Sequence, residues 1–315
     1  MTITAILDSF ELGLIYAILA LGVFLSFRTL NTPDLTVDGS IVTGAAASAI
    51  LCSTGHSPLV ALLASFILAS LAGAVTALLN IKLKIEPLLA GILVMLALYS
   101  LNLRLMGGKS NIALTQSSTI YKNFGAIITN SYSSLLLGII ILAIVALILY
   151  FFLNTRLGFA LRATGDNEYM VRASGVNSNL MKLLGLSLSN GFVGLAGGLL
   201  AQYQSYADVG MGVGMVVIGL ASVIVGETIF ELFTKTVPLF IRLFAVSVGA
   251  ILYRFALAFA LSCGMPATDL KLISAVIVAI ALSTGVMKDS FPKKKISFVS
   301  NTIKPAKDGE SYDTH

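Results

Sequence analysis

The chain has 315 residues, a mean hydropathy of +0.94 and only 11% charged residues. Soluble domains carry about a quarter of their residues as charges, so this composition excludes a soluble protein and indicates an integral membrane protein. The net charge of +5 does not indicate nucleic-acid binding, because six of the twenty basic residues lie between residues 288 and 307, where they read as a topology signal.

Apolar runs near the length of a bilayer crossing follow one another along the chain, separated by short polar breaks. We therefore expect an all-α polytopic membrane protein with about nine crossings, at residues 12–27, 37–51, 59–81, 88–105, 135–152, 183–201, 215–225, 238–261 and 271–287. The second and seventh are short and rich in small residues. Residues 1–288 then form one transmembrane domain, and residues 289–315 a basic, disordered cytoplasmic tail.

Lys and Arg near the ends of the crossings set the orientation. A cytoplasmic C-terminus also places Arg28, Lys82, Lys84 and the four basic residues of the 154–182 segment inside, and leaves Lys109 and Lys122 outside. The sequence therefore predicts an outside N-terminus and an inside C-terminus.

The crossings also suggest an inverted repeat. Crossings one to four start at residues 12, 37, 59 and 88, and crossings six to nine start at 183, 215, 238 and 271. A short, Gly-rich crossing comes second in each set, which is typical of transporters whose pathway lies at matched interrupted segments. Chance spacing in a polytopic chain is the simpler alternative; the matched short crossings favour the repeat.

The polar segment 154–182 is dense in helix start and stop signals. Two helical turns are expected over 157–163, with a break at Thr164 and Gly165, and then a short helix over 167–173. Asp166 is the expected N-cap, Glu168 and Arg172 match the helix dipole, and Gly175 marks the end.

This short helix has a surface suited to docking. The candidate coupling residues share one polar cytoplasmic segment: Arg162, Asp166, Asn167, Glu168, Tyr169, Met170, Arg172 and Gly175. Tyr169 and Met170 could fill a groove in a partner, while Arg162 and Arg172 could pair with acidic residues at its rim. An ordinary solvated loop explains the arginines equally well, but explains the capped helix poorly.

Several residues near the two short crossings are candidates for a translocation path or gate. They are Asp34, Asp38 and Gly39 before or within the second crossing, and Gly210, Gly212 and Gly214 before the seventh. Asp34 is equally well explained as a helix cap. Asp38 lies deeper, and gate, pairing and capping roles all remain open for it.

Arg254 lies well inside the eighth crossing, where it must face protein or a cavity. Its partner could be Asp38, a substrate carboxylate or backbone carbonyls. A structural pair is favoured over a substrate contact, since buried charges are usually matched within the protein.

The segment Gly108-Lys109-Ser110 does not form a phosphate-binding loop, because Leu103 stands where that motif needs glycine. Neither catalytic residues nor a cofactor or metal site are expected, so energy for transport has to come from a partner.

Several stretches resemble a known family. The run Thr155-Arg156-Leu157-Gly158, continuing through Leu161-Arg162-Ala163, Asn167-Glu168 and Ser174-Gly175-Val176-Asn177, is similar to the cytoplasmic loop of the branched-chain amino acid permease family of ABC importers. The run Pro33-Asp34-Leu35-Thr36-Val37-Asp38-Gly39-Ser40, with Leu252-Tyr253-Arg254 and Asp269-Leu270-Lys271-Leu272, resembles the tryptophan/tyrosine-type permeases within it. The resemblance covers residues 12–287.

The resemblance implies a permease of the bacterial cell membrane that takes up an amino acid, aromatic or branched-chain, by ATP-driven alternating access. It also implies three partners: a cytoplasmic ABC ATPase, an extracytoplasmic binding protein and a second permease copy. An ion-coupled secondary transporter is the alternative, since it would share the inverted repeat. A membrane enzyme or channel has no supporting residue pattern.

Overall fold

The computed structural model describes residues 3–128, 132–233 and 238–265, with a few further positions between 272 and 279. The first part comprises α1 (Ile3–Val23) with its π-helical extension η1 (Phe24–Thr29), α2 (Val37–Ser53), α3 (Pro58–Leu83), α4 (Pro87–Leu105), β1 (Asn111–Ala113) and α5 (Ile120–Ile127). The second part comprises α6 (Ser133–Leu153), α7 (Arg156–Asp166), α8 (Glu168–Ala173), α9 (Ser178–Gln204), β2 (Tyr206–Asp208), the 3₁₀ turn η2 (Val209–Gly212), α10 (Met215–Phe233) and α11 (Leu239–Ser262).

The expected all-α polytopic architecture is confirmed. Seven helices within the described residues are long and apolar enough to cross a membrane, and α2, at 17 residues, is a shorter apolar helix. The first eight expected crossings fall on helices, whereas the ninth and the tail at 289–315 lie almost wholly outside the described residues. The seventh crossing was expected to be short, and this is wrong: α10 has 19 residues because its helix continues through Gly226 and Glu227.

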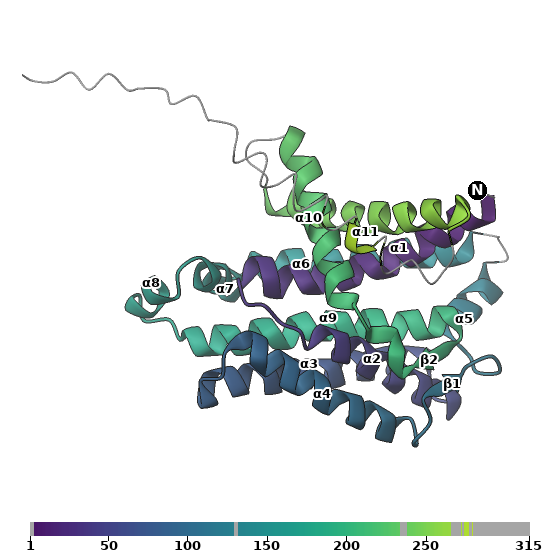
Figure 1. The fold of residues 1–315 in the computed structure, drawn as a ribbon, viewed down its shortest axis with the longest axis horizontal. Helices are drawn as coiled ribbons and strands as arrows, with labels where there is room; N and C mark the ends of the chain where they lie inside the picture. Colours follow the sequence, from purple (N-terminus) through teal and green to yellow (C-terminus); the bar gives the residue numbers. More distant parts are fainter. Residues whose placement is uncertain are drawn as a thin grey trace, which may run out of the picture.

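The helices form one elongated bundle (Figure 1). At one end α7 and α8 project from it, and at the other lie the N-terminus, α5 and the β1–β2 ribbon. This ribbon is antiparallel and pairs Asn111 with Asp208 and Ala113 with Tyr206. Along the bundle, α3 packs against α9 while α11 packs against α1.

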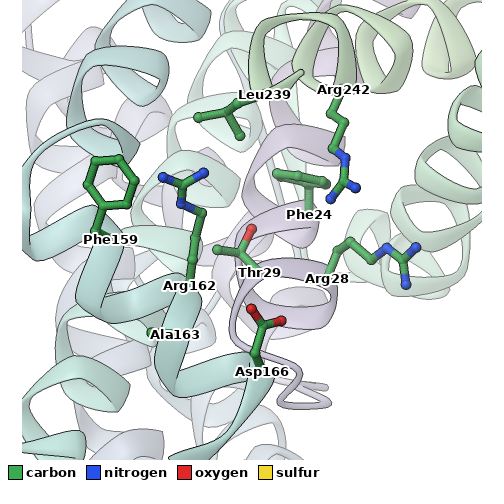
Figure 2. Close-up of a pocket in the computed structure, with 9 residues that line it drawn as sticks. All are labelled: Phe24, Arg28, Thr29, Phe159, Arg162, Ala163, Asp166, Leu239 and Arg242. Carbon is green, nitrogen blue, oxygen red and sulfur yellow. The ribbon is translucent and has the colours of Figure 1, made fainter. Parts of the chain in front are cut away.

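Beside α7, a hollow of about 490 Å³ lies between that helix, η1 and the start of α11 (Figure 2). Arg28, Arg162 and Arg242 line it together with Phe159 and Asp166. We call it the basic pocket.

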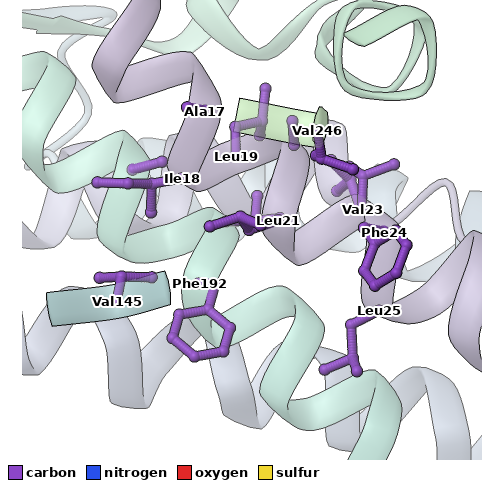
Figure 3. Close-up of a cluster of buried hydrophobic side chains, with 14 of the residues drawn as sticks. Ala17, Ile18, Leu19, Leu21, Val23, Phe24, Leu25, Val145, Phe192 and Val246 are labelled. Carbon is purple, nitrogen blue, oxygen red and sulfur yellow. The ribbon is translucent and has the colours of Figure 1, made fainter. Parts of the chain in front are cut away.

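The core is built around α1 (Figure 3). Its side chains from Ala17 to Leu25 are buried among Val145 of α6, Phe192 of α9 and Val246 of α11. The peripheral helix α6 is the most apolar span and also the most exposed, while α9 is the least apolar long span and mostly buried. This inversion is expected in lipid, where apolar surface faces outward and close packing holds the interior.

Helix α2 lies inside the bundle and depends on small residues. Thirteen of its 17 residues are buried, most of them Gly, Ala, Ser or Thr. At Gly44 the backbone of α9 comes so close that an added Cβ would lie 1.9 Å from the carbonyl oxygen of Gly194. Similar approaches occur at Gly194 toward Ser65 and at Gly197 toward Ile41.

We expect Gly44→Ala to separate α2 from α9, because the added methyl group meets backbone that cannot move aside. Overpacking of this kind costs about 3 kcal/mol or more, so the apparent melting temperature in detergent should fall by several degrees. Gly125→Ala is the control, since the nearest atom to its added Cβ is the Ser133 hydroxyl at 3.6 Å. Equal melting temperatures for the two variants would contradict the close contact.

Candidate functional site

The short helix α8 is capped at both ends. At its start, the Asn167 side chain accepts a hydrogen bond from the Met170 N–H at 3.0 Å. At its end, Gly175 adopts φ +80°, and the Val176 N–H donates to the carbonyl of Val171 at 3.2 Å. A left-handed glycine with this backbone bond satisfies the last carbonyls of a helix. The expected helix over 167–173 is thus present as Glu168–Ala173, with Gly175 as its stop.

Two expected details of this segment are wrong. Asn167, not Asp166, is the N-cap of α8, and α7 continues through Thr164 and Gly165 to end at Asp166. The Thr164 hydroxyl bonds back to the Ala160 carbonyl inside the helix. Gly165 is needed for close packing, since a Cβ there would lie 2.1 Å from the Thr29 carbonyl oxygen. Tertiary contact with η1 therefore overrides the break signal.

Glu168 holds α8 against the start of α9. Its carboxylate forms salt bridges with Arg172 Nη2 at 2.6 Å and Lys182 Nζ at 2.7 Å, and accepts from the Ser178 hydroxyl at 3.1 Å. Partial burial opposes its ionisation, but the hydrogen bond and charge of Lys182, with Ser178 and Arg172, hold the pKa of Glu168 below its usual value. Arg172 is thereby engaged within the chain, and its pairing with a partner's rim stays a prediction.

The remaining surface of α8 is apolar and open. Tyr169 is 84% exposed and Met170 is 68% exposed, while Val171 turns inward and is buried. On the neighbouring helix α7, the guanidinium of Arg162 lies 4.4 Å from the centre of the Phe159 ring.

The other candidate residues meet inside the bundle, where two helices begin. Asp34 is fully buried in the connection between η1 and α2. It accepts from the Thr36 N–H at 2.8 Å and from Asn190 Nδ2 of α9 at 2.6 Å. Its carboxylate thus satisfies one of the free N–H groups at the start of α2, which water would satisfy at a surface.

Asp38 does the same for α10. Its two oxygens accept from the N–H groups of Gly214 at 3.0 Å and Val216 at 2.8 Å. Gly214 has φ +85°, a conformation that turns the chain into α10 without steric cost for glycine. Of the roles left open for Asp38, the structure gives it capping, but of a helix 176 residues away in sequence.

Three further glycines lie at or beside these two helix starts. A Cβ on Gly212 would lie 2.0 Å from the Asp38 carbonyl oxygen, and one on Gly39 would lie 2.8 Å from Leu98 of α4. The Gly210 N–H donates to the Asp208 carboxylate at 2.7 Å, which orders the turn η2. A cavity of about 230 Å³ adjoins this meeting point and is lined by Asp38, Gly39, Gly212, Tyr99 and Asn102, among others.

Arg254 lies apart from this group. Its guanidinium lies 5.4 Å over the ring of Tyr16 on α1, and the salt bridges of the described residues do not include it. The suggested pairing with Asp38 is wrong, because both Asp38 oxygens face the start of α10. A cation–π contact replaces the expected ion pair.

The polar side chains that bond to one another near these carboxylates were not predicted from the sequence. Ser40 donates to the Asn190 side chain at 2.6 Å, and Thr43 donates to that of Asn102 at 2.9 Å. Thr36 and Thr76 share a hydrogen bond of 2.7 Å. Asn102 and Asn190 each stand within an apolar span, and a polar residue in such a place is the signal that could have found them.

A bundle of apolar spans, with a capped polar helix at one end and helices that start inside it, defines a polytopic transport permease. The model of the family "branched-chain amino acid transport system / permease component" matches residues 5–281, and the chain belongs to this family of ABC transporter permeases. It is a multi-pass protein of the bacterial cell membrane, and the expected family resemblance is confirmed.

Named relatives extend this assignment. The tyrosine transport system permease protein of Clostridioides difficile (strain R20291) is 42% identical over 288 residues, which cover 91% of this chain and 93% of the relative. The ribose import permease protein of Escherichia coli (strain K12) is 28% identical over 233 residues, 72% of this chain and 70% of the relative. No solved structure gives a significant match.

We expect Asp38→Ala to destabilise the protein by about 2 kcal/mol, because two N–H groups of α10 lose their acceptor away from water. The matched control is Asp208→Ala, which removes the same kind of cap from the more exposed turn η2 and should cost less. Apparent melting temperatures in detergent check the difference. A larger loss for Asp208→Ala would show that Asp38 does not support the start of α10.

Glu168→Gln should loosen α8, since two salt bridges and part of a hydrogen-bond network are lost. Partly exposed pairs are worth about 0.2–1 kcal/mol each, so amide hydrogen exchange in α8 should quicken by a few-fold. In the wild type the protection of the α8 amides, measured relative to the intrinsic exchange rate at each pH, should also fall in acid, because a carboxylate with a depressed pKa contributes stability that is lost as the pH falls through that pKa. Asp166→Asn, next to α8 but outside these salt bridges, is the control. Unchanged exchange in Glu168→Gln would show that Glu168 does not hold α8 against α9.

Proposed function

We propose that the chain is the membrane-spanning subunit of an ABC importer that takes up an amino acid, with an aromatic one favoured, by ATP-driven alternating access. The observation that carries the proposal is the capped helix α8, which presents Tyr169 and Met170 at one end of a permease bundle. The relative with 42% identity is named for tyrosine. A relative with 28% identity is named for ribose, so membership of the family does not fix the substrate. The proposed amino acid substrate therefore depends on the relative named for tyrosine.

The coupling role belongs to the segment from Arg162 to Gly175. A rigid, capped helix with an exposed apolar surface suits insertion into a groove of a cytoplasmic ATPase, as amphipathic helices do in other complexes. The contacts of Glu168 with Lys182 and Ser178 support this role. They connect α8 to α9, so that a movement of α8 is transmitted to the bundle.

For topology we propose nine crossings, an outside N-terminus and an inside C-terminus. Arg28, Arg156 and Lys182 lie in the elements at the α8 end, which supports a cytoplasmic position for it. An inverted repeat is supported by the packing of α3 on α9 and of α11 on α1, which are corresponding pairs of the two halves. Helices α2 and α10 correspond as well, and both begin inside the bundle.

The proposed path follows these two helix starts, at Asp34, Asp38, Gly39, Gly210, Gly212 and Gly214, with Arg254 nearer the outer end of α11. Helix N-termini carry partial positive charge, and the carboxylates of Asp34 and Asp38 already offset it at these two helix starts. Since Asp34 and Asp38 already accept several N–H groups, they serve this path by holding the helix starts in place.

The proposed partners are a cytoplasmic ABC ATPase at α8, an extracytoplasmic binding protein at the end with α5 and the β1–β2 ribbon, and a second copy of the permease. ATP hydrolysis is then carried out by the ATPase, and this chain needs neither cofactor nor metal.

The second candidate is an ion-coupled secondary transporter, which the buried carboxylate of Asp34 and the partly buried carboxylate of Asp38 favour. The two candidates separate in proteoliposomes. An importer requires the ATPase and ATP, whereas the alternative transports on an ion gradient alone and stops when an ionophore collapses the gradient.

We expect the double change Tyr169→Ala with Met170→Ala to abolish co-purification of the ATPase and to reduce coupled ATP hydrolysis about ten-fold or more, since buried aromatic anchors dominate such interfaces. Tyr132→Ala, an exposed aromatic residue at the start of α6, is the control. The Asn167 cap and the salt bridges of Glu168 remain, so α8 stays folded in the variant. Normal ATPase binding by the double variant would overturn the coupling role.

A further inference from the structure

The basic pocket gathers three arginines from separate parts of the chain. Arg28 comes from η1, Arg162 from α7 and Arg242 from the first turns of α11 (Figure 2). The hollow between them, about 490 Å³, also has Phe24, Thr29 and Leu239 in its walls. Arg28 and Arg242 are exposed and Arg162 is half-buried. Their like charges repel, and an anion placed between them relieves that repulsion.

Acidic groups of the chain balance only part of this charge. Arg28 pairs with Glu227 of α10 at 2.9 Å, and Asp166 lines the pocket. Three arginines and two carboxylates leave one positive charge in excess. In addition, the Arg162 Nε–H is buried without a hydrogen-bond partner among the described residues. Burying an unpaired donor of a charged group costs free energy, and a ligand that supplies an acceptor removes this cost.

The surroundings of the pocket are lipid-facing. Phe159 and Phe240, which flank it, are 57% and 58% exposed, and Leu157 on α7 is 49% exposed. Below it, an apolar groove of about 450 Å³ runs between α6 and α11 and is lined by Leu142, Ala146, Leu147, Phe240, Leu243 and Phe244, among others. Tyr150 and Phe240 meet between the pocket and the groove with ring centroids 5.8 Å apart.

We propose that the basic pocket binds the phosphate of an anionic phospholipid, with the acyl chains lying on the exposed aromatic residues and along the α6–α11 groove. A phosphodiester supplies the single negative charge and the acceptor oxygens that the arginines lack, and arginine binds phosphate in a planar, bidentate manner. The excess positive charge disfavours a headgroup that carries its own ammonium. Basic pockets between spans on the cytoplasmic side bind headgroups in this way.

Binding is tested first on the unmodified protein. The purified permease is placed in nanodiscs of phosphatidylcholine with or without phosphatidylglycerol, and its melting temperature and co-purified lipid are measured. We expect phosphatidylglycerol to be enriched over its share in the mixture and to raise the melting temperature. Equal behaviour in the two lipids would overturn the proposal. So would an equal stabilisation by millimolar inorganic phosphate in neutral detergent, which would mark a free-phosphate site.

Variants then locate the site. Arg162→Gln and Arg242→Gln should each weaken the retention of phosphatidylglycerol about five-fold, the effect of removing about 1 kcal/mol per basic residue. Arg156→Gln is the matched control, because Arg156 is an exposed arginine of the same helix α7 that does not line the pocket. Arg162→Lys keeps the charge and should bind more than Arg162→Gln. Phosphatidylglycerol retention that falls equally in the Arg156 variant would overturn the assignment to this pocket.

Discussion

The structure depends on one constraint: a helix that begins inside a bilayer-spanning bundle has N–H groups that water cannot reach. Each such group left unpaired destabilises the fold, so the chain must supply acceptors of its own. Asp34 supplies one for α2, and Asp38 supplies two for α10. Since Asp34 is itself held by Asn190 of α9, the positions of α2, α9 and α10 are fixed by a few connected polar side chains rather than by apolar contact alone.

These polar contacts also explain why α2 tolerates so little side-chain volume. Donors and acceptors on neighbouring helices reach each other at 2.6–2.9 Å only if the backbones are close. Gly44, Gly194 and Gly197 permit that approach. In lipid these dispersion contacts and hydrogen bonds hold the helices together, as hydrophobic burial does in water.

Much of this could be predicted from the sequence, because membrane spans and helix caps are local signals. The spans followed from apolar length, and α8 followed from Glu168, Arg172 and Gly175. The Asp166 cap was wrong because the decisive contact, Gly165 against Thr29, is remote in sequence. For the same reason the partner of Asp38 was missed: it is a row of backbone N–H groups, which no residue type reveals. Arg28 was interpreted only as a topology signal, since its convergence with Arg162 and Arg242 appears only in three dimensions.

The inversion of polarity across the bundle has a consequence for how the chain can vary. On the lipid-facing helices α4 and α6, leucine, isoleucine, valine and phenylalanine are nearly interchangeable, because the solvent they meet is itself hydrocarbon. In the interior the close packing of the helices depends on the smallest residues, because an added carbon atom would clash with the neighbouring backbone. Substitutions should therefore be tolerated better at the large exposed side chains of α4 and α6 than at the glycines of α2 and α9.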